Sequence, residues 1–356
     1  MNNYDVIVIG GGASGVTCAI NTSKNSNLKL LLLEQNDKIL KKVLKTGNGK
    51  CNLANDNIDE THYNNFDFFS LESDKFNIND YFNDLSLMLR KDNEGRYYPY
   101  SERANSVVNI LLNKLEEYKV DVKTSYKVEK IEKKDNKYIV NGEYISKYLV
   151  IATGSIAQET TNGYDLLKSL NHTITNLSPA LAPIKVKEDI KALSGIRIKC
   201  NLRVNEFNRH GELLFKDDGI SGILALEASR YVNKGDLIYL DFVPDMDINE
   251  LNKYLENDRE NKLNGLLPKM LIKYIEKDNN LIKNFPLTSN GLYDYKNSQI
   301  VKGGVKIEEM NKTMESKKNK NLFVLGEVLD IDGDCGGYNL YFAWLSGVIA
   351  SKNIVK

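Results

Sequence analysis

Little in this sequence points to a membrane, a nucleic acid or a disulfide scaffold. No apolar run approaches the length of a membrane span. Lysine plus arginine and aspartate plus glutamate number 48 each, so no basic field attracts nucleic acid. The cysteines at 18, 51, 200 and 335 form no CxxC pair, which argues against a dithiol reductase or a disulfide framework. The first predicted strand begins at Tyr4 and leaves no room for a signal peptide, so we expect a cytoplasmic protein.

Glycines cluster near the start of the chain, directly after a short apolar run. Tyr4–Ile9 is rich in β-branched residues, as in a strand buried on both faces of a parallel sheet. Gly10 permits a tight turn, Gly12 lets a phosphate approach the backbone, and Gly15 lets the next helix pack closely on the strand. That helix, predicted from about Ala13 to Lys24, would direct its unpaired N–H groups at a pyrophosphate.

A second buried strand, predicted at Leu28–Leu33, ends in an acidic residue. Glu34 is placed where a carboxylate accepts a ribose hydroxyl, and its charge argues against an adenosine 2′-phosphate. A glycine-rich turn without a ligand is the alternative. This alternative is disfavoured because the strand, the helix and the acidic residue follow one another at the spacing of a dinucleotide-binding motif. We therefore predict a bound dinucleotide.

A matching glycine-rich segment near the other end of the sequence indicates which dinucleotide. Asn321–Gly326 is a predicted buried strand that leads to Glu327 and Asp330. The pair Gly336-Gly337 then precedes a predicted helix at Tyr338–Asn353, whose N-terminus would stabilise negative charge on a reduced flavin ring. An ordinary strand–helix unit is the alternative, but two adjacent glycines suggest backbone pressed against a ligand. Two distant segments that hold one long ligand are typical of FAD binding.

The region between these segments is predicted to complete the first domain. Lys41–Asn52 reads as a loop whose basic residues suit phosphates, although a solvated basic loop is equally consistent with its composition. A helix is expected around 78–89, and Ser101 is expected to cap the helix that follows it. Strands of a meander are expected at 120–128, 138–140 and 144–152, the last ending in Ala152-Thr153-Gly154 beside the cofactor.

Beyond Pro179 the pattern changes to strict alternation. Residues 196–204 alternate apolar and polar side chains, as in a half-exposed antiparallel strand, and 207–215 and 236–243 read similarly. Gly219–Gly222 is expected to break this pattern before a helix at 223–231, and 247–283 reads as helical. A β-rich module with a helical insertion therefore interrupts the dinucleotide domain.

Together these motifs resemble the YhiN/BaiN-like flavoproteins, also known as aminoacetone-oxidase-like or NAD(P)/FAD-dependent oxidoreductases. The resemblance covers nearly the whole chain. It rests on Gly10–Gly15, Lys42, Thr46–Asn52, Gly95–Ser101, Ala152–Gly154, Gly219–Gly222, Gly303–Val305, Thr313–Lys317 and Gly326–Ser346. The chain departs from the family where Lys216-Asp217 follow Phe215 and Ile223 replaces a proline, both on the substrate side, and its helical insertion looks shorter.

The resemblance implies an α/β fold with FAD held by the first and last segments. A Rossmann-like FAD-binding domain, with a doubly wound parallel sheet and a β-meander, would comprise 1–180 and 300–356. A β-barrel-like domain at 181–246 and 284–299 would interrupt it and carry the helical insertion at 247–283.

Residue roles also follow from the resemblance. It implies that Glu34 contacts the ribose, the Val128 backbone contacts the adenine, and Lys42 contacts the pyrophosphate. Gly49, Asn52, Gly337, Tyr338 and Asn339 would lie near the isoalloxazine. The predicted cofactor-binding residues are Gly10, Gly12, Ala13, Ser14, Gly15, Glu34, Gln35, Lys42, Thr46, Gly47, Gly49, Asn52, Val128, Ala152, Thr153, Gly154, Gly326, Glu327, Asp330, Gly336, Gly337, Tyr338 and Asn339.

No acid or base for catalysis is evident. The histidines at 62, 172 and 210 lie outside every motif and are interpreted as surface or structural residues, and no metal site is predicted. Three functions remain open. The leading one is hydride transfer through flavin N5, in which NADH or NADPH visits the site transiently and a small molecule with an activated C=C or C=O bond is reduced. The others are an amine oxidase that uses oxygen and a flavin-binding redox sensor without turnover.

Overall fold

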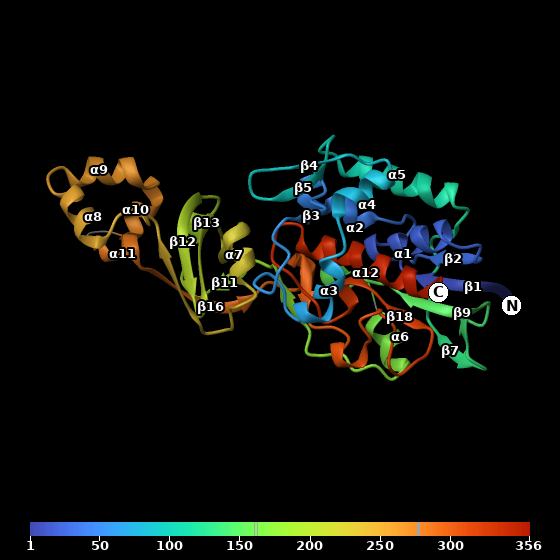
Figure 1. The fold of residues 1–356 in the computed structure, drawn as a ribbon. Helices are drawn as coiled ribbons and strands as arrows, with labels where there is room; N and C mark the ends of the chain where they lie inside the picture. The colour runs from blue at the N-terminus through green and yellow to red at the C-terminus, as the bar shows by residue number, and fades with distance from the viewer. Residues whose placement is uncertain (160, 162, 276–277) are drawn as a thin grey trace. The chain divides into compact units, whose positions relative to one another are not determined.

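The computed structural model describes residues 1–159, 161, 163–275 and 278–356, and these form two compact units. The first unit contains both ends of the chain, residues 1–156 and 301–356, together with residues 163–178. The second unit contains residues 157–159 and 179–300. Each unit has its own cluster of buried apolar side chains. Figure 1 shows the helices and strands of both units.

A seven-stranded sheet lies at the centre of the first unit. Its parallel strands are β6 (Asp121–Lys123), β2 (Leu30–Leu33), β1 (Asn2–Ile9), β9 (Tyr144–Ile151) and β18 (Leu322–Val324). Its antiparallel meander consists of β7 (Ile131–Lys134) and β8 (Lys137–Val140), which lead into β9. The apolar residues of β1 are almost fully buried, as expected for a strand covered on both faces. The predicted parallel sheet with a meander is confirmed.

One strand of the predicted meander lies at the other edge of the sheet. Of the residues 120–128, only β6 is extended, and it pairs in parallel with β2 instead of joining the meander. The chain then turns toward the end of β2, where the Tyr126 N–H donates to the Glu34 carbonyl oxygen at 2.8 Å. The meander prediction was therefore wrong for this segment, because pairing with β2 and with the residues after it takes up its backbone groups.

Two long helices from opposite ends of the chain pack together on the sheet. α1 (Ala13–Lys24) lies beside α12 (Tyr338–Ile354), as Figure 1 shows. A Cβ atom at Gly347 would lie 2.7 Å from the Ser14 carbonyl oxygen and 2.8 Å from Thr17 Cβ. Only a residue without a side chain allows this close approach. Both helices match the predicted ranges to within one residue.

The remaining elements of the first unit are short. They are α2 (Lys41–Lys45), β3 (Ala54–Asn55), α3 (Ser70–Ser73), α4 (Ile78–Asp84), β4 (Leu89–Lys91), β5 (Arg96–Pro99), α5 (Ala104–Glu117) and α6 (Gly163–Ser169). The loop predicted at 41–52 is wrong in its first half, which forms α2. α4 ends before Leu89 because that residue begins β4. Ser101 does not cap α5, which begins after Arg103 without a side-chain cap; Ser101 Oγ instead donates to Ser106 Oγ at 2.8 Å.

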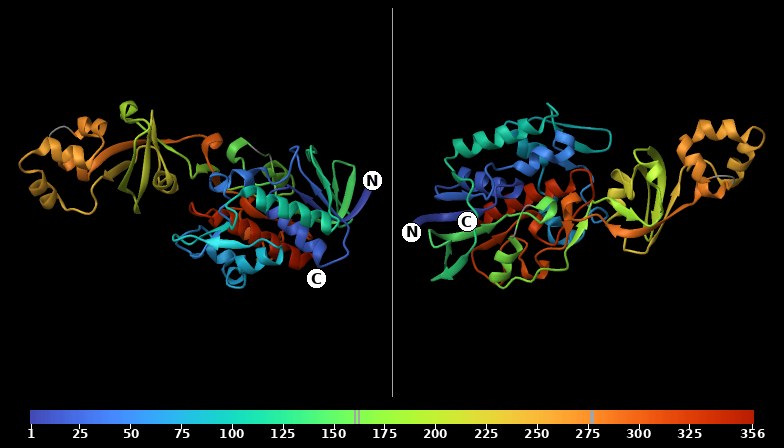
Figure 2. Two further views of the ribbon diagram at one scale, coloured as in Figure 1. Left: turned by 90° about the horizontal axis from the view of Figure 1, so that it is seen from above. Right: turned by 180° about the vertical axis from the view of Figure 1, so that it is seen from behind.

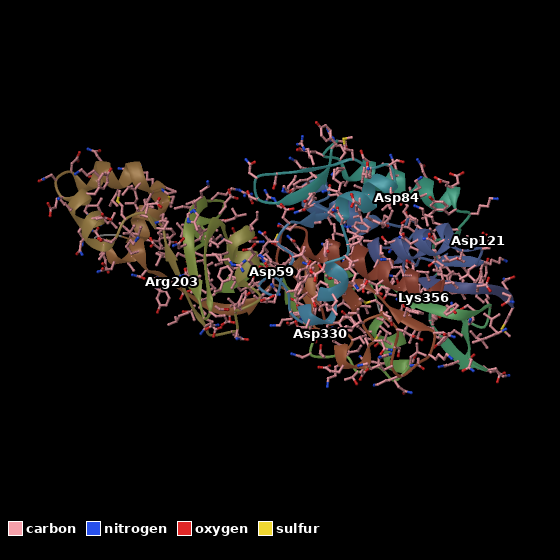
Figure 3. All side chains as sticks on the ribbon, in the orientation of Figure 1. Asp59, Asp84, Asp121, Arg203, Asp330 and Lys356 are labelled. Carbon is pink, nitrogen blue, oxygen red and sulfur yellow. The ribbon has the colours of Figure 1, made fainter. Side chains whose placement is uncertain are left out.

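The second unit contains a closed barrel of antiparallel strands. Its strands, in barrel order, are β11 (Ile184–Val186), β14 (Gly219–Ser221), β13 (Phe207–Lys216), β12 (Arg197–Val204), β15 (Leu237–Asp241) and β16 (Phe285–Leu292). The alternation predicted for β12 is confirmed, because Cys200 and Leu202 are buried whereas Lys199 and Arg203, the latter labelled in Figure 3, are exposed. The predicted barrel-like domain is confirmed as a closed barrel.

The glycine-containing segment after β13 is a strand rather than an interruption. β14 pairs with β13 on one side and with β11 on the other, so these three residues close the barrel. A Cβ atom at Gly219 would lie 2.2 Å from the Ile184 carbonyl oxygen, which explains the glycine. The expected break at 219–222 was therefore wrong, because neighbouring strands satisfy the backbone of a segment that looks like a turn in isolation.

Helices complete the second unit, as Figure 2 shows from two further sides. They are α7 (Ile223–Ala228), α8 (Ile248–Leu255), α9 (Arg259–Leu266), α10 (Lys269–Ile275) and α11 (Asn280–Lys283), whereas β10 (Ser178–Ala180) and β17 (Ile300–Lys302) pair at the ends of the insertion. Leucines of α8 to α10 belong to the same apolar cluster as the barrel interior. The helical pattern predicted for 247–283 is confirmed in its described residues. Within the described ranges, no helix has the length and apolar composition to cross a membrane.

Candidate functional site

The turn from β1 into α1 contains glycines with two different surroundings. Gly10 has a φ of +110°, and a Cβ atom there would lie 2.3 Å from the Ala152 carbonyl oxygen. A Cβ atom at Gly15 would lie 2.0 Å from the Gly10 carbonyl oxygen, so both positions require glycine for packing. Among the described residues, no atom lies within 4 Å of a Cβ atom built at Gly12. The backbone at the start of α1 is therefore open, which suits an approaching phosphate.

The segment after β18 lies against this turn. A Cβ atom at Gly326 would lie 2.7 Å from Ser14 Oγ, and the Gly326 N–H donates to Ser346 Oγ at 3.1 Å. The next residue, Glu327, accepts a hydrogen bond from Lys42 Nζ at 3.1 Å, across 285 residues of sequence. The two glycine-rich signatures of the sequence thus meet at the carboxyl end of the sheet, where doubly wound folds bind their ligands.

The side chain of Glu34 is buried beneath the first turn. One carboxylate oxygen accepts the Gly11 N–H at 2.8 Å, and the other accepts two hydrogen bonds from Asn36, at 2.8 Å from the backbone and 2.7 Å from the side chain. Since an ionised carboxylate has about four acceptor sites, capacity remains for a ribose hydroxyl. Nothing in the sequence pattern identified Asn36, whose role follows from the tight turn after β2.

Two further predicted residues flank Glu34. The Val128 side chain is buried, and its backbone N–H and C=O make no hydrogen bond within the described part of the chain. A purine edge could therefore pair with them. Gln35 points outward and is exposed. The Tyr126 N–H, two residues before Val128, donates to the Glu34 carbonyl oxygen at 2.8 Å, and contact of Val128 with an adenine stays a prediction.

Ala152, Thr153 and Gly154 follow β9 and face the same edge of the sheet. Thr153 Oγ1 is buried and has no hydrogen-bond partner among the described residues. Ser155, which the sequence analysis did not identify, donates its hydroxyl to Glu327 at 2.5 Å. Glu327 therefore accepts from both Ser155 and Lys42, so part of the charge of Lys42 is already balanced before any phosphate is present.

Asn52 and the glycine pair at the start of α12 form the other half of the site. The Asn52 side chain is 8% exposed, and its Oδ1 atom is buried without a hydrogen-bond partner in the described residues. This atom lies 2.6 Å from the position of a Cβ atom on Gly337, whose φ is +104°. A buried acceptor without a donor costs about 1–3 kcal/mol. A flavin ring would supply an N–H donor at this point, so the residues present fit that group.

Several predicted residues already use their polar atoms within the protein. Thr46 Oγ1 donates to the Val43 carbonyl oxygen at 2.7 Å. Asp330, labelled in Figure 3, accepts a hydrogen bond from Thr175 Oγ1 at 2.9 Å. The Asn339 amide spans the loop before α12, accepting from the Gly333 N–H at 2.8 Å and donating to its carbonyl oxygen at 2.9 Å. These side chains shape the site, and their contact with a cofactor stays a prediction.

Three further predicted glycines have positive φ values. Gly47 has a φ of +54° and Gly49 one of +83°, and both lie in the tight turn after α2. Gly336 has a φ of +118°, and its carbonyl oxygen accepts from Asn55 Nδ2 at 3.1 Å. Tyr338, the first residue of α12, is 4% exposed. Glycine is favoured at these positive φ values because it has no Cβ atom.

A histidine that no motif identified lies beside this glycine pair. His62 Nδ1 is 3.0 Å from Asp334 Oδ2, and the imidazole ring stacks on Tyr338 with ring centroids 4.5 Å apart. The Asp334 side chain is 1% exposed, whereas that of His62 is 21% exposed. The pair was missed because 272 residues separate its members and His62 belongs to no recognisable pattern.

Cys51, which directly precedes the predicted flavin-binding residue Asn52, is an inert thiol. Cys51 is fully buried, and burial raises its pKa to about 12. A thiolate is the reactive form of cysteine, so Cys51 fills space and does not act as a nucleophile. Among the described residues, no group of histidine, cysteine and carboxylate side chains has a geometry that could hold a metal ion.

Comparisons with known proteins agree with this arrangement. The family model of the HI0933-like protein Rossmann domain matches residues 4–353. The 3-dehydro-bile acid delta(4,6)-reductase of Clostridium scindens is 30% identical over 399 aligned positions, covering 97% of each chain. The ribosomal RNA dihydrouridine synthase of Haemophilus influenzae is 26% identical and covers 100% of both.

Solved structures with similar folds are flavoenzymes with low sequence identity. The 3-ketosteroid-delta4-(5alpha)-dehydrogenase from Rhodococcus jostii RHA1 has a TM-score of 0.54 at 12% identity, covering 100% of this chain and 97% of that one. A flavocytochrome c3 fumarate reductase has a TM-score of 0.51 at 14% identity, covering 99% and 78%. These similarities concern the fold. The chain therefore belongs to the HI0933-like Rossmann family of FAD-dependent oxidoreductases, which confirms the resemblance found in its motifs.

Proposed function

We propose that the protein is an FAD-dependent reductase that saturates a carbon–carbon double bond conjugated to a carbonyl group. The names of two relatives support this reaction class. One reduces the delta(4,6) bonds of a 3-dehydro-bile acid, and the other produces dihydrouridine, in which a uracil double bond has been saturated. Both reactions add a hydride and a proton across a double bond that a neighbouring carbonyl polarises.

The observation that carries this proposal is the unpartnered Asn52 Oδ1 atom beside the glycine pair at the start of α12. A hydrogen-bond acceptor and a helix N-terminus at one point suit a flat heterocycle that holds an N–H donor and gains negative charge when reduced. FAD supplies the hydride in this site. Gly12 and the start of α1 would hold the pyrophosphate, and Glu34 would hold the ribose, so that the reacting ring is fixed at α12.

NADH or NADPH is proposed as the electron donor. The sequence has no second GxGxxG motif, so a nicotinamide would have to visit the flavin site transiently and leave before the second substrate enters. The donor and the substrate would then use one binding face in turn. An oxidase that passes electrons from an amine to oxygen would need the same cofactor site, and so would a flavin-binding redox sensor.

A small molecule is proposed as substrate in preference to RNA. The equal numbers of basic and acidic residues favour this choice, because an overall excess of positive charge would strengthen the binding of RNA. RNA is the second candidate, since the ribosomal RNA dihydrouridine synthases match this chain along its whole length. Incubation of the reduced protein with ribosomal RNA, followed by measurement of dihydrouridine, distinguishes the two.

The first experiment mixes the purified FAD-loaded protein anaerobically with NADH or NADPH and follows flavin absorbance. Bleaching identifies the donor. Addition of 2-cyclohexen-1-one or a 3-oxo-4-ene steroid should then restore the oxidised spectrum and give the saturated ketone. If neither ketone nor RNA reoxidises the flavin but oxygen does so with peroxide release, an amine oxidase is favoured. A flavin that does not cycle with any of these small molecules favours a sensor.

A further inference from the structure

We propose that His62, held by Asp334, donates the proton that completes the reduction of the double bond. This inference rests on the proposed function, because saturation of a conjugated double bond requires one hydride and one proton. The hydride comes from the reduced cofactor. The proton must come from a group of the protein or from water.

The two side chains form a pair whose geometry is fixed on both sides. His62 follows a turn in which its N–H donates to the Asp59 carbonyl oxygen at 3.2 Å. Its Nδ1 atom lies 3.0 Å from Asp334 Oδ2, and its own carbonyl oxygen accepts the Asp334 N–H at 2.9 Å. The neighbouring Tyr63 forms an isolated β-bridge with Gly333. The side-chain contact is therefore supported by backbone pairing and not by two mobile side chains.

The pair lies at the helix N-terminus where the flavin ring is expected. The His62 ring stacks on Tyr338 at an interplanar angle of 19°, and Tyr338 directly follows Gly337 in the chain. The Tyr63 hydroxyl donates to the Tyr338 carbonyl oxygen at 2.6 Å, which anchors the same segment to the first turn of α12. The imidazole thus packs against Tyr338, which the family resemblance places near the isoalloxazine.

The Asp334 side chain is buried, whereas the His62 side chain is partly exposed, as a proton donor held by a carboxylate requires. The Asp334 carboxylate is almost completely buried, and a buried carboxylate needs a donor or a positive charge beside it. A protonated imidazole supplies both. The His62 side chain keeps 21% of its surface exposed, so it can exchange protons with water. With Nδ1 directed at Asp334, the proton is transferred from Nε2.

The step balances in atoms and charge. The hydride forms a C–H bond at the carbon β to the carbonyl, and the electron pair of the double bond moves toward the carbonyl oxygen. The Nε2–H bond of the imidazolium breaks, and its proton forms the second C–H bond at the α carbon. The neutral imidazole then recovers a proton from water. Overall the substrate gains one hydride, which a bound and reduced FAD would supply, and one proton from the imidazolium, so two C–H bonds replace the double bond.

Other ionisable groups surround the pair and must be considered in any pH measurement. The titratable side chains on the turn of His62 and on the segments packed against it include those of Asp59, Glu60, Tyr63, Asp332, Asp334, Cys335 and Tyr338. Asp59, labelled in Figure 3, lies on the same turn as His62.

The loop before α12 is held by contacts other than the pair of His62 and Asp334. The Asn339 amide already binds this loop, with hydrogen bonds to the N–H and carbonyl of Gly333 and one of 3.2 Å to the Asp334 carbonyl oxygen. Replacement of the His62 ring should therefore leave the loop in place. His62→Gln tests proton transfer separately from loop structure.

The experiment compares the FAD-loaded wild type with His62→Gln and Asp334→Asn, and uses His210→Gln as a matched control. His210 lies on barrel strand β13, with its ring nitrogen 3.1 Å from Asn201 Oδ1. Each protein is reduced anaerobically with dithionite and mixed with 2-cyclohexen-1-one in a stopped-flow instrument across a pH series. His62→Gln should slow flavin reoxidation by about 10²–10⁴-fold, as expected for loss of an acid catalyst, without a change in FAD occupancy.

The pH profile separates a proton donor from a structural residue. Wild-type reoxidation should slow as the pH rises and the imidazole loses its proton, and this dependence should vanish in His62→Gln. Asp334→Asn removes a negative charge from beside the ring, so the decline should move to lower pH. His210→Gln should behave as wild type.

NMR spectroscopy can detect the pair without turnover, because the chain has three histidines. Selective ¹⁵N-histidine labelling should show a His62 signal with its Nδ1 proton held, and Asp334→Asn should abolish that signature. If the wild-type flavin is not reoxidised by the ketone, the proposed function fails while the NMR result still decides whether the pair forms. If wild type turns over and both rate and pH profile survive in His62→Gln, the proton-donor role is wrong. Should His62→Gln lose its flavin, the pH shift of Asp334→Asn decides the question.

Discussion

At the scale of single residues, two glycines of one turn should respond differently to the same substitution. Gly12 has an ordinary φ of −83°, and among the described residues nothing lies within 4 Å of its Cβ position, so Gly12→Val should fold. The valine would occupy the space of a phosphate, and the purified protein should be colourless. Gly15→Val would push into the Gly10 carbonyl and should lower the free energy of unfolding by at least ~1–3 kcal/mol.

Flavin absorbance and urea unfolding distinguish these two effects. A yellow Gly12→Val protein with normal occupancy would mean that the opening motif holds no phosphate. A colourless Gly15→Val protein would be uninformative about the cofactor unless its unfolding curve were normal, which is why Gly12 is the better test.

A second residue-scale prediction concerns acid stability. His172 is buried with Nδ1 at 3.0 Å from Glu309 and Nε2 at 2.9 Å from Ser316 Oγ. Burial lowers the His172 pKa below its usual value. For Glu309 burial acts in the opposite direction, but hydrogen bonds from Lys318 and Thr173 hold its pKa at about 2.

Both groups therefore bind protons more weakly in the folded than in the unfolded state. Stability should fall first below pH 6.5, where His172 protonates in the unfolded chain, and again from about pH 4.5 toward 2, where Glu309 does so. Glu309→Gln should flatten the second decline in urea titrations made at several pH values. An unchanged slope between pH 4.5 and 3 would contradict the assignment.

At the scale of elements, the crossing of α1 and α12 depends on one position. Gly347→Ala would place a methyl group 2.7 Å from the Ser14 carbonyl oxygen and should destabilise the first unit by about 1–3 kcal/mol. Gly265→Ala in α9 is the matched control, since no described atom lies within 4 Å of its Cβ position. Because alanine favours helix over glycine, the control should stabilise by about 0.5–1 kcal/mol. Equal effects of the two substitutions on urea midpoints would show that the close crossing is unimportant.

Elements with strong local patterns could be predicted from the sequence, and elements defined by distant partners could not. α1 and β1 follow from a buried apolar run, three glycines and helical periodicity within a few residues. β14 is a strand only because β11 and β13 flank it, and β6 joins β2 and not the meander that follows it in sequence. The same reason explains why the sequence analysis missed the role of His62, whose partner Asp334 is remote in sequence.

At the scale of the whole molecule, the two units have separate apolar cores, and every predicted cofactor residue lies in the first. Calorimetry of the protein without FAD should show the unfolding of both units. Added FAD should raise the unfolding temperature of the first unit only. At 100 times its dissociation constant, FAD should increase the free energy of unfolding of that unit by about 2.7 kcal/mol. Leu202→Ala in the barrel, a fully buried site, should lower the other transition alone, at a cost of about 2–5 kcal/mol. A shift of both transitions by FAD would contradict a site confined to the first unit.

The pairing of α1 with α12 also has a consequence for protein synthesis. The second unit lies within residues 157–300, so the ribosome releases all of it before residues 322–354 of the first unit emerge. Domains fold as units during translation, and the barrel can therefore form on the nascent chain. The fifth parallel strand, β18, can join the sheet only after these residues emerge, and α1 can pack against α12 only after α12 emerges. Cofactor loading is thus a late, essentially post-translational event, and a truncated translation product that stops before α12 would be unable to retain FAD.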